Sequence, residues 1–371
     1  MYKNLVIITI IISLNSYFAF GQKYSKPISI IKKEIKAHNK AVHVFDDWMR
    51  DPYITIGPDG YYYLTVTQHG DSVESRKIRN DGVPLYKSKD LAQWKFERYI
   101  YTITQDATNA ADYVAEREKK NKDSQNTWGP EMLKLWAPEI HYIDGKWHLL
   151  HTSNAGLGNF VSTKSKELNA PYKGWNERFG QQHDPTIFVD DDNSKWLISR
   201  CARIQKLNDD LTNYDGKPID INPSNRKMGH EGSAILKIGG KYVFYGTAWS
   251  TDNMRKGTYN LYYCVSDKLE GPYDERKFIG RFLGHGTIFK DKKGKWWCTA
   301  FYNANKPPLT TDELKTTDFS NNAYTINKQG LTLVPLDLKI VKGEIVISAK
   351  DPLYKFPGNE EVQQLNTLNI K

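Results

Sequence analysis

Cysteine is scarce in this chain of 371 residues. Its three cysteines, Cys201, Cys264 and Cys298, are odd in number and widely separated. Small domains held together by disulfides need a dense and paired set of cysteines, so that class of protein is excluded. Each of the three lies within a run of strand-forming residues, which predicts buried free thiols rather than a bridge.

Long apolar runs are missing beyond the first residues. Lys3 precedes an apolar run over residues 5–14, and small and aromatic residues follow at 18–21. This order is typical of a signal peptide, so we interpret residues 1–21 as a cleaved leader and expect a soluble protein, secreted or periplasmic. An uncleaved N-terminal anchor is the alternative. No later segment approaches the roughly 20 apolar residues of a membrane-spanning helix.

Dense clusters of one charge are absent as well, although the formal net charge is +9. Lysine and arginine are dispersed, and no basic run accompanies a base-reading motif, so we expect no nucleic-acid partner. The charge has two interpretations. It favours a solvated basic surface, and it is also compatible with an anionic or sulfated polysaccharide as the substrate.

Aromatic residues are abundant: the chain has 23 Tyr, 14 Phe and 10 Trp. Such side chains suit half-buried pleated surfaces and favour β structure. An alternating strand, a turn of Asp, Gly, Asn or Lys, and a second aromatic-rich strand form a hairpin unit that recurs five times. The copies cover residues 53–67, 140–153, 186–200, 233–247 and 287–301.

The repeat predicts an all-β fold, a five-bladed β-propeller with four short strands in each blade. We expect the propeller over residues 45–330, after an N-terminal extension at 22–44 that contains a short lysine-rich helix. Residues 331–371 hold a hairpin and tail that close the ring or pack against it. The long first interval contains a polar insertion at 105–125, which either shapes a substrate pocket or is a solvated excursion.

Aligning the copies by their turns selects one position in each blade. Nine residues back from each turn, the chain has Asp51, Trp136, Asp184, Glu231 and His285. Equivalent positions in a propeller surround one central channel, so we expect these residues to converge. Acetal hydrolysis needs one carboxyl group kept protonated as the acid and another ionised as base or nucleophile, and a third carboxyl group can tune the acid.

These residues and their neighbours resemble the glycoside hydrolase family 43 group of five-bladed propellers, with family 117 as a close relative. The resemblance covers about residues 48–302. It depends on the order and blade placement of five segments: Arg50-Asp51-Pro52, Trp136-Ala137-Pro138-Glu139, His183-Asp184-Pro185, Glu231-Gly232-Ser233 and Gly284-His285-Gly286.

The resemblance implies an inverting glycoside hydrolase. Asp51 is then the general base, Glu231 the general acid, and Asp184 the residue that raises the pKa of the acid and orients it. Family members often hold a divalent ion in the channel, commonly calcium, and His285 would be its ligand. Three alternatives stay open: a family 117-like hydrolase of agar-derived or carrageenan-derived anhydrogalactose oligosaccharides, a retaining enzyme, and a non-catalytic glycan-binding propeller.

Five further residues are candidates for substrate contacts. Trp136 and Trp249 can stack on sugar faces, and Arg50 can bind a hydroxyl, carboxylate or sulfate. His183 and His230 each precede a carboxyl candidate, so they are expected either to contact substrate and assist the acid or to be structural. The sequence does not identify the sugar or its linkage. The insertion slightly favours exo action.

Overall fold

The computed structural model describes residues 23–68, 82–107, 111, 115, 134–153, 160–163, 166–168, 171–174, 182–303 and 306–363. The expected signal peptide at 1–21 and most of the insertion at 105–125 lie outside these residues. Within the described part of the chain, no helix is both long enough and apolar enough to cross a membrane.

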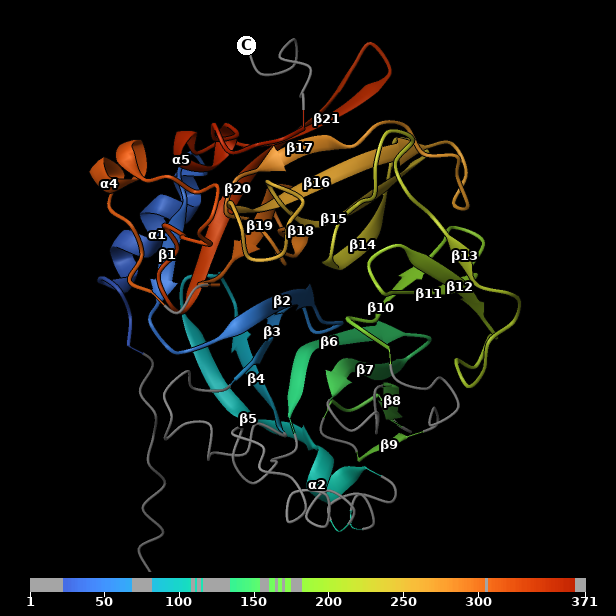
Figure 1. Cartoon of the computed structure of the whole chain (residues 1–371). Coiled ribbons are helices and arrows are strands. Elements are labelled where there is room, and N and C mark those ends of the chain that lie inside the picture. Colours follow the sequence, from blue (N-terminus) through green and yellow to red (C-terminus); the bar gives the residue numbers. More distant parts are fainter. Residues whose placement is uncertain are drawn as a thin grey trace, which may run out of the picture.

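Five antiparallel sheets follow one another around a ring in chain order (Figure 1), which confirms the predicted five-bladed propeller. Blades one to four each contain four consecutive strands, which run outward from the centre. Blade one contains β2 (Arg50–Ile56), β3 (Tyr62–Thr67), β4 (Gly82–Ser88) and β5 (Trp94–Thr102), and blade two contains β6 (Leu135–Ile143), β7 (Lys146–Ser153), β8 (Phe160–Thr163) and β9 (Tyr172–Gly174). Blade three contains β10 (Thr186–Val189), β11 (Lys195–Ser199), β12 (Arg203–Leu207) and β13 (Ile219–Asp220). Blade four contains β14 (Glu231–Ile238), β15 (Lys241–Trp249), β16 (Tyr259–Ser266) and β17 (Lys277–Gly280).

Blade five is built from both ends of the chain. It contains β18 (Ile288–Lys290), β19 (Trp296–Ala300), β20 (Leu331–Val341) and, as its outer strand, β1 (Val42–Phe45). β1 pairs antiparallel with β20, and β21 (Glu344–Ala349) extends β20 into a hairpin. The sheet of the propeller therefore includes strands on both sides of the range 45–330, and pairing between the two chain ends closes the ring.

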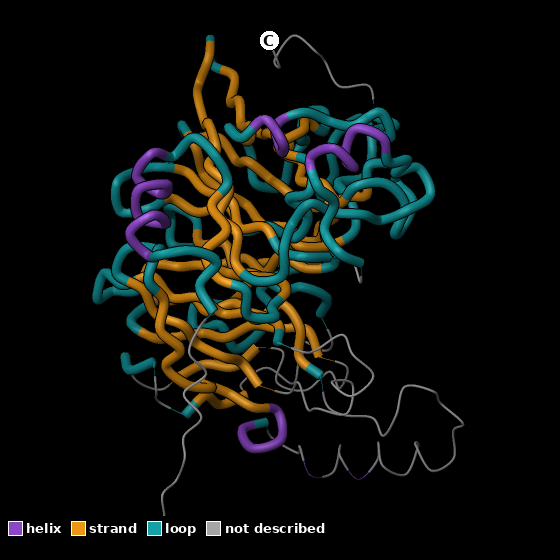
Figure 2. The backbone as a smooth tube through the Cα atoms, turned by 90° about the vertical axis from the view of Figure 1, so that its left-hand side faces the viewer, coloured by secondary structure: helices purple, strands orange, loops and turns teal. Residues whose placement is uncertain are grey.

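Helices lie at the periphery of the strand-rich body (Figure 2): α1 (Ile28–Ala37), α2 (Ile103–Asp106), α4 (Thr311–Thr316) and α5 (Pro352–Lys355). Aromatic residues fill the spaces between blades. Trp297 and Phe45 are fully buried in one such cluster, and Phe244 and Tyr262 in another. All three cysteines are free and buried.

One left-handed residue lies at the start of each inner strand. The φ angles are +48° at Asp51, +47° at Ala137, +44° at Asp184, +59° at Gly232 and +53° at His285. In blades one, two and four the preceding residues, Arg50, Trp136 and Glu231, pair with a threonine of the second strand, and a bulge follows. These five positions are therefore equivalent in the structure.

The alignment by a fixed count from the turn is wrong by one residue in blades two and four. Their hairpins join Ile143 to Lys146 and Ile238 to Lys241, through two-residue turns whose members all have positive φ. The inner hairpins of the other blades have longer loops. Counting from turns of unequal length selected Trp136 and Glu231 where the equivalent residues are Ala137 and Gly232.

Candidate active site

One imidazole lies where residues of four blades meet. His285 Nδ1 has three carboxylate neighbours: Asp51 Oδ1 at 3.3 Å, Asp184 Oδ2 at 3.8 Å and Glu231 Oε1 at 3.7 Å. Asp51 and Asp184 are nearly buried, whereas the Glu231 side chain is 34% exposed. The four ionisable residues that the repeat selected therefore form one cluster, with Glu231 the most open to a ligand.

Threonines at the ends of second strands connect neighbouring blades behind this cluster. The backbone N–H groups of Ala137, Asp184 and His285 donate to Thr67 Oγ1, Thr152 Oγ1 and Thr247 Oγ1 of the preceding blade, at 2.7, 2.7 and 2.6 Å. Thr67 also donates to Asp51 Oδ2 at 2.6 Å, and Thr152 donates to Asp184 Oδ1 at 3.0 Å. The hydroxyl groups of Thr67 and Thr152 thus each bind the left-handed backbone of the next blade and also hold a carboxylate.

Glu231 has a hydroxyl partner from the third strand of its own blade. Tyr259, the first residue of β16, donates a hydrogen bond to Glu231 Oε1. The Tyr259 ring packs against Trp249, with ring centroids 4.4 Å apart. Trp249 is only 7% exposed, which leaves its ring little surface for a sugar. We therefore interpret Trp249 as the support of Tyr259 and not as a stacking platform.

The charges of the cluster shift three of its pKa values. Burial by itself would lower the pKa of His285, but the three surrounding carboxylates raise it to about 10. Burial would raise the pKa of Glu231, but His285 and the Tyr259 hydroxyl lower it to about 2. Burial raises the pKa of Asp184, and the charge of Glu231 adds to this effect. At neutral pH the cluster holds a proton on His285, and Glu231 is ionised.

Two of the other candidates lie at the rim of this cluster. His183 is half exposed, and its Nε2 lies 3.6 Å from Glu231 Oε2 and 3.8 Å from Asp184 Oδ2. Arg50 is half-buried, with its guanidinium 5.6 Å from the centre of the Phe301 ring. His183 is therefore more exposed than Glu231 and lies beside it, where both can contact the same ligand.

Trp136 and His230 are both half-buried. Trp136 pairs with Thr152, one position before the left-handed residue of its blade. The His230 backbone N–H donates to Thr247 O at 2.6 Å, and its Nδ1 is buried without a hydrogen-bond partner among the described residues. Burial lowers the pKa of His230, which favours its neutral form.

A divalent cation bound by His285 was one expectation from the sequence. His285 Nδ1 faces three carboxylate oxygens, at 3.3 Å from Asp51, 3.8 Å from Asp184 and 3.7 Å from Glu231. Among the described residues, the group whose ligand atoms lie within 4.8 Å of one another is His183, Asp184 and Glu231. This group does not include His285, so calcium binding by His285 stays a prediction and no catalytic step below depends on it.

Sequence reasoning missed Tyr259 and the threonines. Tyr259 belongs to a third strand, and the repeat comparison used the first two strands of each blade. Thr67, Thr152 and Thr247 lie within the last three residues of the second strand in three of the five copies, so the same alignment contained a signal for them. Their contacts with the next blade could not be inferred without the ring geometry.

Comparisons with known proteins give one matching family model and several relatives. The family model described as "Glycosyl hydrolases family 43" matches residues 44–328. A beta-xylosidase of Formosa agariphila is 20% identical over 271 residues, which are 64% of this chain and 42% of that protein. An extracellular endo-alpha-(1->5)-L-arabinanase of Bacillus subtilis is 22% identical over 267 residues, 67% of this chain and 75% of its own. The chain thus covers less than half of the xylosidase.

A solved structure shows the same fold. The endo-1,4-beta-xylanase of Bacteroides thetaiotaomicron superposes with a TM-score of 0.53 at 19% identity. The match covers 84% of this chain and 97% of that one. At this level of identity the likeness is one of fold.

Proposed function

The chain belongs to glycoside hydrolase family 43, as its motifs predicted, and we propose that it hydrolyses glycosidic bonds by an inverting single displacement. Asp51 is the general base, Glu231 the general acid, and Asp184 the residue that modulates the acid. The observation that carries this proposal is the meeting of all three carboxylates around His285 Nδ1, from separate blades.

The proposed reaction is a single exchange at the anomeric carbon. Asp51, held by Thr67, takes a proton from a water molecule whose oxygen forms the new bond to carbon. The bond between that carbon and the glycosidic oxygen breaks, and Glu231 gives its proton to the departing oxygen. After this step Asp51 carries a proton and Glu231 has lost one. Proton exchange with solvent returns both carboxyl groups to their starting states.

Glu231 has to take up a proton before it can act as the acid. Its partners His285 and Tyr259 stabilise the ionised form in the free site. A sugar bound against its exposed side removes water from the carboxylate, which raises its pKa. The neighbouring carboxylate of Asp184 acts in the same direction, since a like charge disfavours ionisation.

The contacts with His285 set only an upper bound on the distance between acid and base, and this bound allows inversion as well as retention. Because both carboxylates lie near one Nδ1 atom, at 3.3 and 3.7 Å, their nearest oxygens are at most about 7 Å apart. Inverting enzymes separate the two groups by roughly 6.5–9.5 Å and retaining enzymes by roughly 5–5.5 Å. Inversion is therefore supported mainly by family membership, and product stereochemistry tests it directly.

For the substrate, we propose oligosaccharides or polysaccharides of xylose or arabinose. The supporting observation is that the similar proteins are named as a beta-xylosidase and an arabinanase. Exo action and export from the cell are part of the proposal. The segments from which they were inferred, 105–125 and 1–21, lie almost entirely outside the described residues.

Release of reducing sugar from a panel of xylo-, arabino- and algal oligosaccharides tests the proposed activity. We expect Glu231→Gln and Asp51→Asn to lose about 10²- to 10⁴-fold in rate. Asp220→Asn is a matched control, because this carboxylate is exposed and pairs with Arg203 away from the cluster. Full activity in either site variant contradicts the assigned roles. Binding of a panel member without its hydrolysis supports the non-catalytic alternative.

Early NMR spectra of the product test the stereochemistry. Inversion predicts that the first anomer formed is opposite to that of the substrate, before mutarotation mixes the two forms. A product that retains the configuration indicates that Asp51 attacks the sugar directly.

A further inference from the structure

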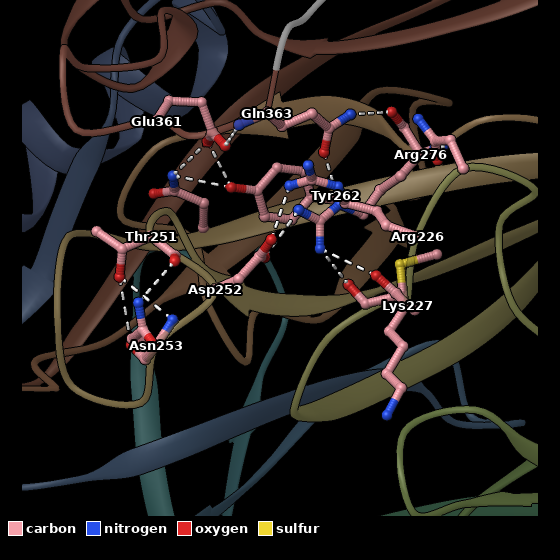
Figure 3. Close-up of polar contacts among 12 residues, drawn as sticks. Arg226, Lys227, Thr251, Asp252, Asn253, Tyr262, Arg276, Glu361 and Gln363 are labelled. Atoms are coloured by element: carbon pink, nitrogen blue, oxygen red, sulfur yellow. Dashed lines mark hydrogen bonds and ion pairs between the residues drawn. The ribbon is translucent and has the colours of Figure 1, made fainter.

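The last described residues of the chain form a strap across blade four. We define the C-terminal strap as residues 358–363. Its Val362 N–H donates to Ser250 O at 3.0 Å, beside the loop that follows β15. Three of its polar side chains, Glu360, Glu361 and Gln363, reach into the blade (Figure 3 shows the last two).

One set of strap contacts lies behind Tyr259. Thr258 donates to Glu360 at 2.7 Å, and Tyr262 donates to Glu361 at 2.6 Å. Asn260 Nδ2 lies 3.5 Å from Glu361 as well. Residues 258, 260 and 262 alternate along the strand and share one face, whereas Tyr259 points to the other face, where it holds Glu231. The strap therefore fixes the strand that carries the hydrogen-bond partner of the acid.

A second set of contacts reaches the backbone that leads into Glu231. Arg276 is buried, with its side chain 1% exposed, and donates from Nε to Gln363 Oε1 at 2.6 Å. Its Nη1 donates to the carbonyls of Lys227 and Met228 at 3.0 and 3.1 Å (Figure 3). A buried guanidinium needs several acceptors. Because one acceptor belongs to the strap and two belong to the segment just before Glu231, Arg276 connects the strap to that segment.

The segment between Met228 and Glu231 has little freedom to absorb a shift. A Cβ on Gly229 would lie 2.0 Å from Thr247 O, and the His230 N–H donates to the same oxygen. Movement of the Met228 carbonyl is therefore transmitted to the acid. The tight packing of Gly229 against β15 makes the link stiff.

A third contact lies next to His285. Glu360 forms a buried ion pair with Arg281 at 2.8 Å. The following residue, Phe282, donates its N–H to Asn260, and Gly284 donates to Tyr259 O at 2.9 Å. The strap thus contacts the segments that carry the hydroxyl and imidazole partners of Glu231, and it reaches the segment before Glu231 through Arg276.

We propose that the C-terminal strap positions the general acid of the active site, with Arg276 and Gln363 as positioning residues for Glu231. This inference rests on the proposed hydrolase function and names a part that lies outside the catalytic cluster. A strap that only stabilised the fold would slow all substrates equally. A strap that aligns the acid affects those substrates whose leaving group needs a proton.

Kinetics on two leaving groups test the proposal in the full chain. For the sugar that the wild type cleaves, we compare an unactivated disaccharide with the 2,4-dinitrophenyl glycoside, whose leaving group departs without protonation. For Gln363→Ala we expect kcat to fall about 10- to 100-fold on the disaccharide and less than about threefold on the aryl glycoside. Glu361→Gln, a milder change, should show the same preference if Gln363→Ala does not fold.

Asp351→Ala is the matched control. Asp351 is also buried near the C-terminus, but it caps α5 and accepts from the Ala41 N–H, next to strands of blade five and not of blade four. We expect it to lower stability without changing the ratio between the two substrates. Equal losses on both substrates in the strap variants, or no loss on either, overturn the proposal.

Hydrogen exchange separates this proposal from the proposed activity. In the strap variants, we expect faster amide exchange in the peptides that contain residues 228–231 and 259–261. If the wild type hydrolyses no glycoside, the proposed function fails, and unchanged exchange then overturns the strap as well. Faster exchange with an unchanged leaving-group ratio shows that the strap is structural only.

Discussion

The hydroxyl of Tyr259 donates a hydrogen bond to the carboxylate of Glu231, from the third strand of the same blade to the first. This bond stabilises the ionised form of the acid and holds it toward His285. The acid of the proposed mechanism is therefore tuned by a residue outside the repeated motif.

Tyr259→Phe removes this bond and keeps the ring that packs on Trp249. Because the hydroxyl lowers the pKa of Glu231, we expect that pKa to rise, and the limb of the kcat/KM profile that reports the acid to move to higher pH. We expect kcat to fall about tenfold as the acid loses its alignment. An unchanged pH profile contradicts this role of Tyr259.

Gly232→Ala tests the crowding between Gly232 and His285. A Cβ at this position would lie 2.7 Å from His285 Cδ2, and the residue has φ +59°. We expect displacement of the imidazole and a loss of activity of at least about tenfold. Gly240→Ala is the matched control, since it has φ +80° and open space around its Cβ. Both variants should lose about 1 kcal/mol of unfolding free energy from the left-handed backbone, but only the first should lose activity.

Trp136→Ala tests sugar contact at the rim. If Trp136 stacks on the sugar in ground state and transition state alike, KM rises about tenfold and kcat stays constant. Trp296→Ala provides the comparison, because Trp296 is also half-buried but lies at the turn end of its blade. A fall in kcat without a change in KM would assign Trp136 to the catalytic step instead.

The buried His148 should make the free energy of unfolding fall in acid. Burial lowers its pKa to about 4, and its Nδ1 lies 2.7 Å from the Ser162 hydroxyl. The unfolded chain takes up a proton near pH 6.5 and the folded chain only near pH 4, so this contribution is complete above pH 6.5 and is lost as the pH falls toward 4. The loss amounts to about 3 kcal/mol.

Denaturant unfolding of His148→Gln checks that window. Between pH 6.5 and 4 the free energy of unfolding of the variant should fall less steeply than that of the wild type. Above pH 6.5 the two curves should run parallel. Parallel curves throughout the acid range would show that His148 takes up its proton at the same pH in the folded protein as in the unfolded chain.

The sequence was sufficient for the number of blades and for most of the cluster. Each blade carries its own hairpin signal, and Asp51, Asp184 and His285 occupy equivalent left-handed positions at which the count from the turn was correct. It failed in blades two and four because hairpin length varies between blades. Glu231 nevertheless reaches the cluster from the neighbouring position, since its longer side chain extends to His285.

What the sequence by itself determined is local: strands, turns, and the order in which three carboxyls and a histidine follow one another. The tertiary structure decided which of them touch. Closing the ring with β1 and β20 sets blades one and five side by side, which brings Asp51 to His285. Only that closure surrounds His285 with three carboxylates, which raise its pKa. Only the folded C-terminal strap brings Gln363 into contact with Arg276. Contacts between distant segments depend on packing geometry, which no local pattern encodes.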